Sequence, residues 1–123
     1  MPKKIVLVGH CGPDSSYLRI AVAKASKDVQ ILSADDDGEL SHALGQQPDL
    51  LLVNRELGIG FSETLGVKLI EKLVKQKTPV KTMLVSNYAE AQQEATQAGA
   101  LPGFGKREVG TPKVTELLLA ALG

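Results

Sequence analysis

Short runs of mostly apolar residues recur along the chain at intervals typical of alternating strands and helices. Four of these runs occupy 5–8, 29–32, 49–53 and 82–85. Apolar runs of this length are typical of strands that helices cover on both faces of a parallel sheet. A fifth strand is expected at 100–104, where Pro102 and Gly103 favour an edge position because proline cannot donate to a neighbouring strand.

The segments between these runs carry apolar residues at helical spacing. This spacing predicts five helices, over 14–27, 39–44, 89–98 and 112–122 and between 62 and 74. Asp14 or Ser15 is expected to cap the first helix and Ser62 the third, while Thr111 precedes Pro112 at the start of the last. Five strand–helix units predict an α/β fold, with a parallel sheet, right-handed crossovers and helices on both faces.

The length and composition of the chain indicate the number of domains and exclude several classes of protein. The chain has 123 residues and a mass of 13.0 kDa, which fits a single domain over 1–123. Its 14 Lys and Arg residues balance 14 Asp and Glu residues, and a net charge of zero argues against binding nucleic acid or a membrane surface. A single cysteine excludes an internal disulfide, and no apolar run approaches the about 18 residues of a membrane span. The N-terminus lacks a signal-peptide pattern, so we expect a cytoplasmic protein.

Several segments, taken in order and at their spacing, resemble one protein family. The segment 34–40 is similar to the one that joins a receiver's second strand to its second helix, and 48–53 is similar to the entry to its third strand. Ala98, Gly99 and Ala100 match a receiver's Ala-Gly-Ala, and Lys106 follows Gly99 at the family's spacing. The chain therefore resembles, over nearly its whole length, the receiver domain of bacterial two-component response regulators. We expect a flavodoxin-like sheet in the order 2-1-3-4-5.

The resemblance also implies a site at the carboxyl ends of the strands. A receiver has two acidic residues after the first strand that hold magnesium, a phosphate-accepting aspartate after the third, Ser or Thr after the fourth and Lys after the fifth. Ser86 and Lys106 match this pattern. Gly9 and His10 stand at the acidic pair, and Asn54 stands at the acceptor position.

These replacements change the chemistry that the site can perform. Magnesium prefers carboxylate oxygens, and an acyl phosphate requires a carboxylate nucleophile. We therefore expect a receiver-like signalling domain of a two-component phosphorelay that is not phosphorylated at the usual site, is not an enzyme and holds no metal or cofactor. Two roles stay open for Asn54, Ser86 and Lys106. Either they satisfy each other's hydrogen bonds, with the Asn54 amide oxygen accepting from Lys106, or they bind a ligand.

The resemblance implies partners that are proteins. A histidine kinase, an effector domain or another signalling protein is expected, with no direct binding to nucleic acid or membrane. In the family, the face formed by the fourth helix, fifth strand and fifth helix engages partners, and a homodimer through this face is one form that such contacts could take.

Cys11 supports an alternative function. The segment around Cys11 resembles the cysteine loop of the IIB subunits of sugar phosphotransferase systems, over about the first thirty residues. Cys11 would then accept a phosphoryl group, with Ser15 and Ser16 around it. Asp14 lies in the same turn, and its negative charge is unfavourable opposite phosphate. In the other interpretation, Cys11 is an unreactive small residue in a turn.

Three further features carry weaker expectations. The acidic run 35–37 fits a solvated turn better than a metal site. Arg55 and Glu56 are expected to pair at the surface, where an ion pair contributes little stability. Phe61 is expected to plug the core from the third helix.

Overall fold

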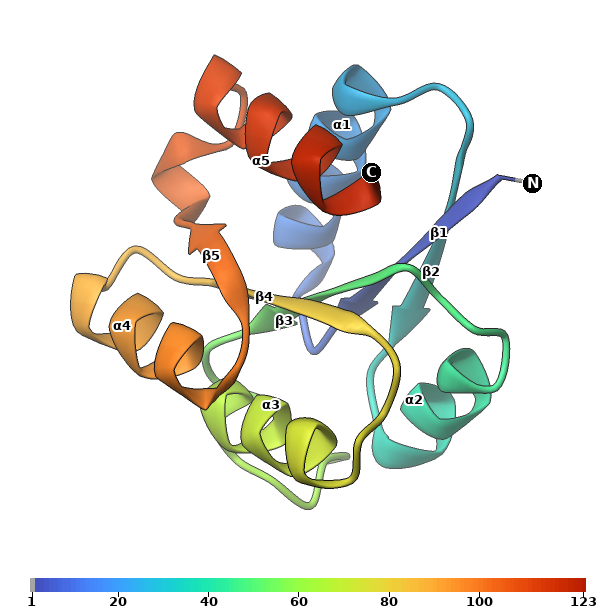
Figure 1. Ribbon diagram of the computed structural model, residues 1–123, viewed down its shortest axis with the longest axis vertical. Coiled ribbons are helices and arrows are strands. Elements are labelled where there is room, and N and C mark those ends of the chain that lie inside the picture. The colour runs from blue at the N-terminus through green and yellow to red at the C-terminus, as the bar shows by residue number, and fades with distance from the viewer. Residues whose placement is uncertain (1) are drawn as a thin grey trace.

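The computed structural model describes residues 2–123 and contains one five-stranded sheet (Figure 1). All strand pairs are parallel and their order is β2-β1-β3-β4-β5, which confirms the expected flavodoxin-like sheet. The strands are β1 (Lys3–Val8), β2 (Val29–Ala34), β3 (Leu50–Asn54), β4 (Lys81–Val85) and β5 (Leu101–Phe104). The edge position predicted for β5 is also confirmed.

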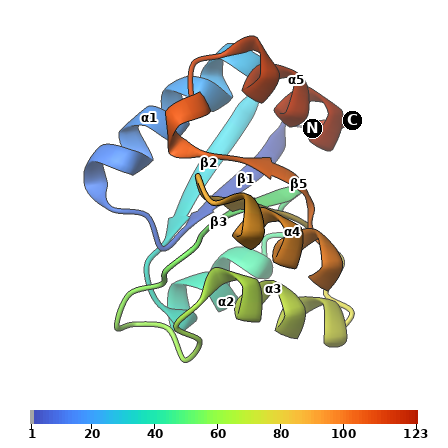
Figure 2. The same cartoon turned by 90° about the vertical axis from the view of Figure 1, so that its left-hand side faces the viewer.

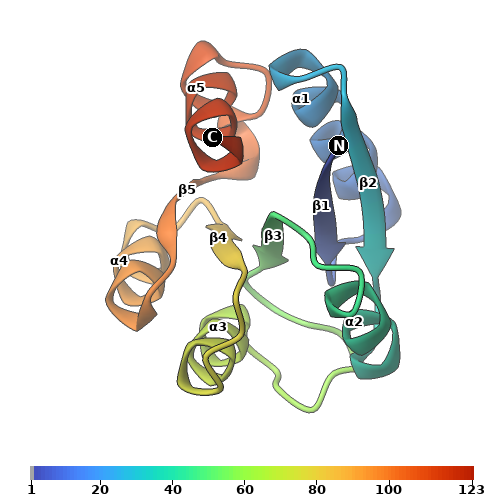
Figure 3. The same cartoon turned by 45° about the vertical axis from the view of Figure 1, so that its right-hand side comes forward.

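Helices cover both faces of this sheet. The helices are α1 (Gly12–Ala25), α2 (Asp37–Leu44), α3 (Gly66–Lys75), α4 (Ala89–Ala98) and α5 (Pro112–Leu122), with a 3-10 helix η1 (Lys106–Glu108) after β5. Figures 2 and 3 show α1 and α5 on one face and α2, α3 and α4 on the other. None of the helices within residues 2–123 is both long and apolar enough to cross a membrane.

Alternation along the central strands divides the core into two layers. In β1, Ile5 and Leu7 pack in the layer of α1 and α5. The intervening Val6 and Val8 pack in the layer of α2, α3 and α4. All four side chains are fully or almost fully buried, as expected of a strand covered on both faces.

The start of α1 differs from the prediction. The helix begins at Gly12, and Cys11 occupies the N-cap position without a side-chain bond to the first N–H groups of the helix, so neither Asp14 nor Ser15 is the cap. Pro13 lies in the first turn, where its fixed φ suits the start of a helix. Asp14 consequently lies inside the first turn, where a carboxylate interacts favourably with the helix dipole.

The start of α3 also differs, because a structured loop precedes it. Ser62 does not cap the helix, which begins four residues later at Gly66. Glu56 and Leu65 form an antiparallel bridge that closes the loop over 55–65. Phe61 is buried in this loop and does not belong to α3. A Cβ at Gly66 would lie 2.1 Å from the Asn54 carbonyl oxygen, so this close approach to the end of β3 requires glycine.

A glutamine from α4 holds the irregular edge between β4 and β5. The register between these strands shifts by one residue, and a Cβ at Gly103 would lie 2.1 Å from the Leu84 carbonyl oxygen. The Gln92 amide nitrogen donates to the carbonyl oxygens of Leu84 at 2.8 Å, Ser86 at 3.2 Å and Phe104 at 3.3 Å. Gln92 therefore joins α4 to the carboxyl ends of both strands.

Candidate functional site

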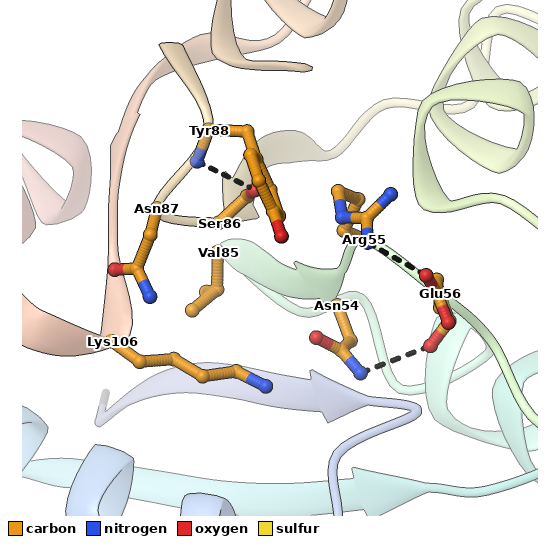
Figure 4. A pocket seen from close by; sticks show the side chains of 8 residues that line it. All are labelled: Asn54, Arg55, Glu56, Val85, Ser86, Asn87, Tyr88 and Lys106. Atoms are coloured by element: carbon orange, nitrogen blue, oxygen red, sulfur yellow. Dashed lines mark hydrogen bonds and ion pairs between the residues drawn. The ribbon is translucent and has the colours of Figure 1, made fainter. Parts of the chain in front are cut away.

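Four strand ends bring the predicted site residues together at one edge of the sheet. These residues lie after β1 (Gly9, His10 and Cys11), at the end of β3 (Asn54), after β4 (Ser86) and after β5 (Lys106). Two adjoining cavities open among them, one of about 230 Å³ that includes Ser86 and one of about 490 Å³ that includes Cys11. We call them the Ser86 cavity, whose lining side chains Figure 4 shows, and the Cys11 cavity. Asn54 and Lys106 line both.

Asn54 uses its amide nitrogen to tie the end of β3 to two neighbouring segments. Its Nδ2 donates to the carbonyl oxygen of Gly9 at 3.1 Å and to that of Glu56 at 2.9 Å. Both N–H groups of the amide are thus occupied by acceptors. A carboxylate at this position would have no proton to offer either carbonyl group.

Gly9 adopts a backbone conformation that disfavours any side chain. Its φ is 72°, in the left-handed region that suits glycine. A Cβ there would also lie 2.7 Å from the Leu57 Cδ2 atom. The positive φ is thus the main reason that the turn after β1 fits glycine, because the end of the Leu57 side chain can move aside.

Lys106 forms an ion pair with Asp14, which sequence reasoning did not predict. The Lys106 Nζ and Asp14 Oδ2 atoms lie 2.6 Å apart, so the pair joins the start of η1 to the first turn of α1. The three residues expected either to bond to one another or to bind a ligand each contact other groups. Asn54 donates to Gly9 and Glu56, Lys106 pairs with Asp14, and the Ser86 hydroxyl accepts from the Tyr88 backbone N–H at 3.1 Å. The hydrogen bond from Lys106, and a weaker one from the Cys11 thiol, lower the pKa of Asp14.

His10 is buried and lines the Cys11 cavity together with Asp14 and Lys106. Its side chain is 7% exposed, and Nε2 lies 2.8 Å from the Leu52 carbonyl oxygen, which can only accept. Nε2 therefore carries the proton, and Nδ1 is buried without a partner. Burial lowers the pKa of His10 and Lys106 lowers it further, against the opposing effects of the Leu52 hydrogen bond, Asp14 and Asp35. The ring is neutral at physiological pH.

Cys11 is exposed at the mouth of the second cavity. The Asp14 carboxylate lies in the first turn of α1, three residues after Cys11. This negative charge opposes a phosphoryl group on sulfur, and no contact in this part of the molecule favours the cysteine phosphotransfer alternative.

Two carboxylates of the acidic run 35–37 accept hydrogen bonds from backbone N–H groups. Asp36 caps α2, accepting from the Glu39 N–H at 2.7 Å, and Asp37 accepts from the Ser62 N–H at 2.9 Å. These contacts fit the predicted solvated turn. Within residues 2–123, no three His, Cys, Asp or Glu side chains are grouped so that they could hold a metal ion.

Arg55 and Tyr88 form a wall of the Ser86 cavity. The Arg55 guanidinium lies 4.7 Å from the centroid of the Tyr88 ring, a distance typical of a cation–π contact. Arg55 also pairs with Glu56 at 2.6 Å, which confirms the predicted surface pair (Figure 4). The role of Tyr88 was not predicted, and no motif around it signals one.

The chain resembles known proteins in structure but not in sequence. No protein-family model matches the sequence, and no curated protein sequence matches it. The N-terminal signal receiver domain of a two-component response regulator from Bacteroides fragilis is similar with a TM-score of 0.76 and 18% identity, over 100% of this chain and 98% of that one. The signal receiver domain of a DNA-binding response regulator from Colwellia psychrerythraea gives 0.69 and 13%, over 93% of each chain.

A third solved structure carries a modified residue. It is a response regulator protein from Burkholderia pseudomallei with a phosphorylated aspartic acid, a calcium ion and citrate. Its TM-score is 0.63 at 19% identity, over 98% of this chain and 66% of that one. At such identities the similarity concerns the fold. The chain has the fold of the receiver domains of two-component response regulators.

Proposed function

We propose that this chain is a receiver-like signalling domain that acts through contacts with other proteins and is not phosphorylated at the end of β3. The observation that carries the proposal is the hydrogen bonding of Asn54. Its amide donates to two backbone carbonyl groups, so the position is occupied by a structural donor where the resemblance places a phosphate acceptor. An amide has no anionic oxygen with which to form an acyl phosphate.

The surroundings of Asn54 support the same proposal. A receiver-type site holds its divalent cation on carboxylates, and Mg²⁺ requires hard oxygen ligands. Here Gly9 lies in a conformation that disfavours side chains. His10 directs Nε2 to a backbone oxygen and is a nitrogen donor in any case. The solved Burkholderia pseudomallei protein, with its phosphorylated aspartic acid and calcium ion, has the chemistry that we propose this chain lacks.

The Asp14–Lys106 ion pair supplies a reason for the site to be stable without a phosphoryl group. The Lys106 side chain is 39% exposed and that of Asp14 is 24% exposed, so water shields the pair only in part. Asp14 neutralises the Lys106 ammonium from within the chain and joins the start of α1 to the start of η1. On this proposal, the domain is held in one state or responds to a signal other than phosphorylation.

The proposed partners are proteins: a histidine kinase, an effector domain or another signalling protein. We propose a single, non-enzymatic domain of the cytoplasm. A homodimer through α4, β5 and α5 stays a prediction, which light scattering over a range of concentrations would test.

Intact-mass measurement tests the proposed chemistry. The protein is incubated with acetyl phosphate and Mg²⁺, beside a receiver that retains its aspartate and acidic pair as the positive control. We expect the control to gain one phosphoryl group while the mass of this protein stays unchanged. A stoichiometric, hydroxylamine-labile phosphoryl adduct on this protein would overturn the proposal.

A further inference from the structure

We propose that a groove between α3 and α4 binds a partner segment that presents a bulky apolar side chain flanked by basic residues. The inference rests on the proposed function, because it assigns the place and the chemistry of a protein contact. The groove has a volume of about 420 Å³ and lies at the N-terminal ends of both helices. Pockets that bind small ligands have volumes of about 300–1,000 Å³, and the groove falls within this range.

The groove has apolar walls that remain open to solvent. Leu65 is 41% exposed and Tyr88 is 62% exposed, although both are large apolar side chains. Val67 and Ala91 line the groove between them and pack on the core below. Exposed apolar side chains that lie together are typical of contact sites, because burying their surface against a partner is favourable.

The rim of the groove is acidic. Glu90 and Glu94 are exposed, lie one turn apart on α4 and line the groove. Within residues 2–123 neither glutamate belongs to an ion pair. Like charges four residues apart on a helix repel each other, so basic groups of a partner would relieve this repulsion. Arg55, the basic residue of the groove, is already paired with Glu56.

This charge pattern selects one class of occupant. A nucleic acid or an acidic membrane surface would be repelled by Glu90 and Glu94. An acidic peptide would be repelled in the same way. A segment with a large apolar side chain and lysine or arginine at matching spacing satisfies both the walls and the rim.

The groove also adjoins the candidate site. Arg55 and Tyr88, stacked at 4.7 Å, line both the groove and the Ser86 cavity. A partner that packs on Tyr88 would therefore contact a wall of the strand-end site. This places the proposed contact on the α3 side of α4, away from the α4–β5–α5 face predicted for a homodimer.

A peptide titration monitored by two-dimensional NMR tests the proposal. The probe is a synthetic amphipathic helical peptide of about four turns with leucine on one face and lysine beside it. The matched probe has glutamate in place of every lysine. We expect the lysine peptide to shift the backbone signals of Leu65, Val67, Glu90 and Ala91 saturably, and the glutamate peptide to leave them unchanged.

Two charge-reversal variants of the protein complete the test. Glu94→Lys reverses the charge of one of the two rim glutamates, whereas Glu116→Lys makes the same change of charge at an exposed site on α5. We expect Glu94→Lys to weaken binding of the lysine peptide roughly tenfold and Glu116→Lys to leave it unchanged. Signal dispersion in the NMR spectra reports that both variants are folded.

Several outcomes would overturn the assignment. Equal weakening by both variants, shifts confined to other surfaces, or no saturable shift at millimolar peptide would each do so. Self-association that Glu94→Lys abolishes would replace the partner with a second copy of this chain. Failure of the peptide to bind leaves the phosphodonor result standing, whereas phosphorylation of the chain would overturn the proposed function without touching the groove.

Discussion

Replacing His10 with glutamine is expected to flatten the dependence of stability on pH below the ordinary histidine pKa of 6.5. The ring is buried, and burial lowers its pKa in the folded state. The unfolded chain then binds a proton that the folded chain excludes, so the free energy of unfolding falls as the pH falls through this window. Above the ordinary pKa the ring is neutral in both states, and its contribution is constant.

The size of the effect follows from linkage. If the folded ring stays neutral, one proton costs about 1.4 kcal/mol of stability between about pH 7.5 and pH 5.5. This is an upper limit, because a folded-state pKa inside that interval would reduce the loss. Burial is the largest influence on the pKa and Lys106 acts in the same direction. The Leu52 hydrogen bond, Asp14 and Asp35 oppose both.

Urea unfolding at the two pH values measures this loss. His10→Gln retains an N–H group that can donate to the Leu52 carbonyl oxygen but has no proton to gain in this range. His42→Gln is the matched control, since His42 is exposed on α2. The wild type and the His42 variant should lose stability on acidification and His10→Gln should lose much less. Equal losses in all three proteins would refute the reasoning.

Three other substitutions test contacts that hold the site. Asp14→Asn should cost about 1 kcal/mol at neutral pH, a difference that disappears as the pH falls through the lowered Asp14 pKa, while exposed Asp28→Asn should have little effect in the same unfolding assay. Gln92→Ala should cost about 1–3 kcal/mol and accelerate amide hydrogen exchange in α4, because it removes the donor to three carbonyl groups. Gly66→Ala should cost about 1–3 kcal/mol in thermal or urea unfolding, since its Cβ would approach a backbone oxygen. Gly58→Ala, with nothing within 4 Å of its Cβ, is the control.

The strands of the sheet could be predicted because short stretches of sequence, such as apolar runs and proline, identify them. Continuous apolar runs identify β1 and β3, and their alternating residues pack in the two layers of the core. Pro102 and Gly103 place β5 at the edge, as observed. Helix starts were less predictable, because the capping rule looks for a polar side chain. Cys11 and Leu65 occupy the N-cap positions of α1 and α3 without capping side-chain hydrogen bonds, so neither start carries the polar signal that the rule requires.

The same error explains what the sequence missed in the site. Gly9, Asn54 and Lys106 gather at the strand ends because the topology requires it. The partner of Lys106 depends on where α1 begins. When α1 starts at Gly12, Asp14 falls in its first turn and comes within 2.6 Å of the Lys106 ammonium.

The most direct test of the account is an NMR titration of the protein with Mg²⁺ and beryllofluoride, a mimic of the aspartyl phosphoryl group. An amide at Asn54, a glycine at position 9 and a lysine already paired with Asp14 offer no site for this pair of ions. We predict no saturable change in the backbone signals of Gly9, His10 and Asn54. Saturable shifts of these signals that require both ions together would contradict the account.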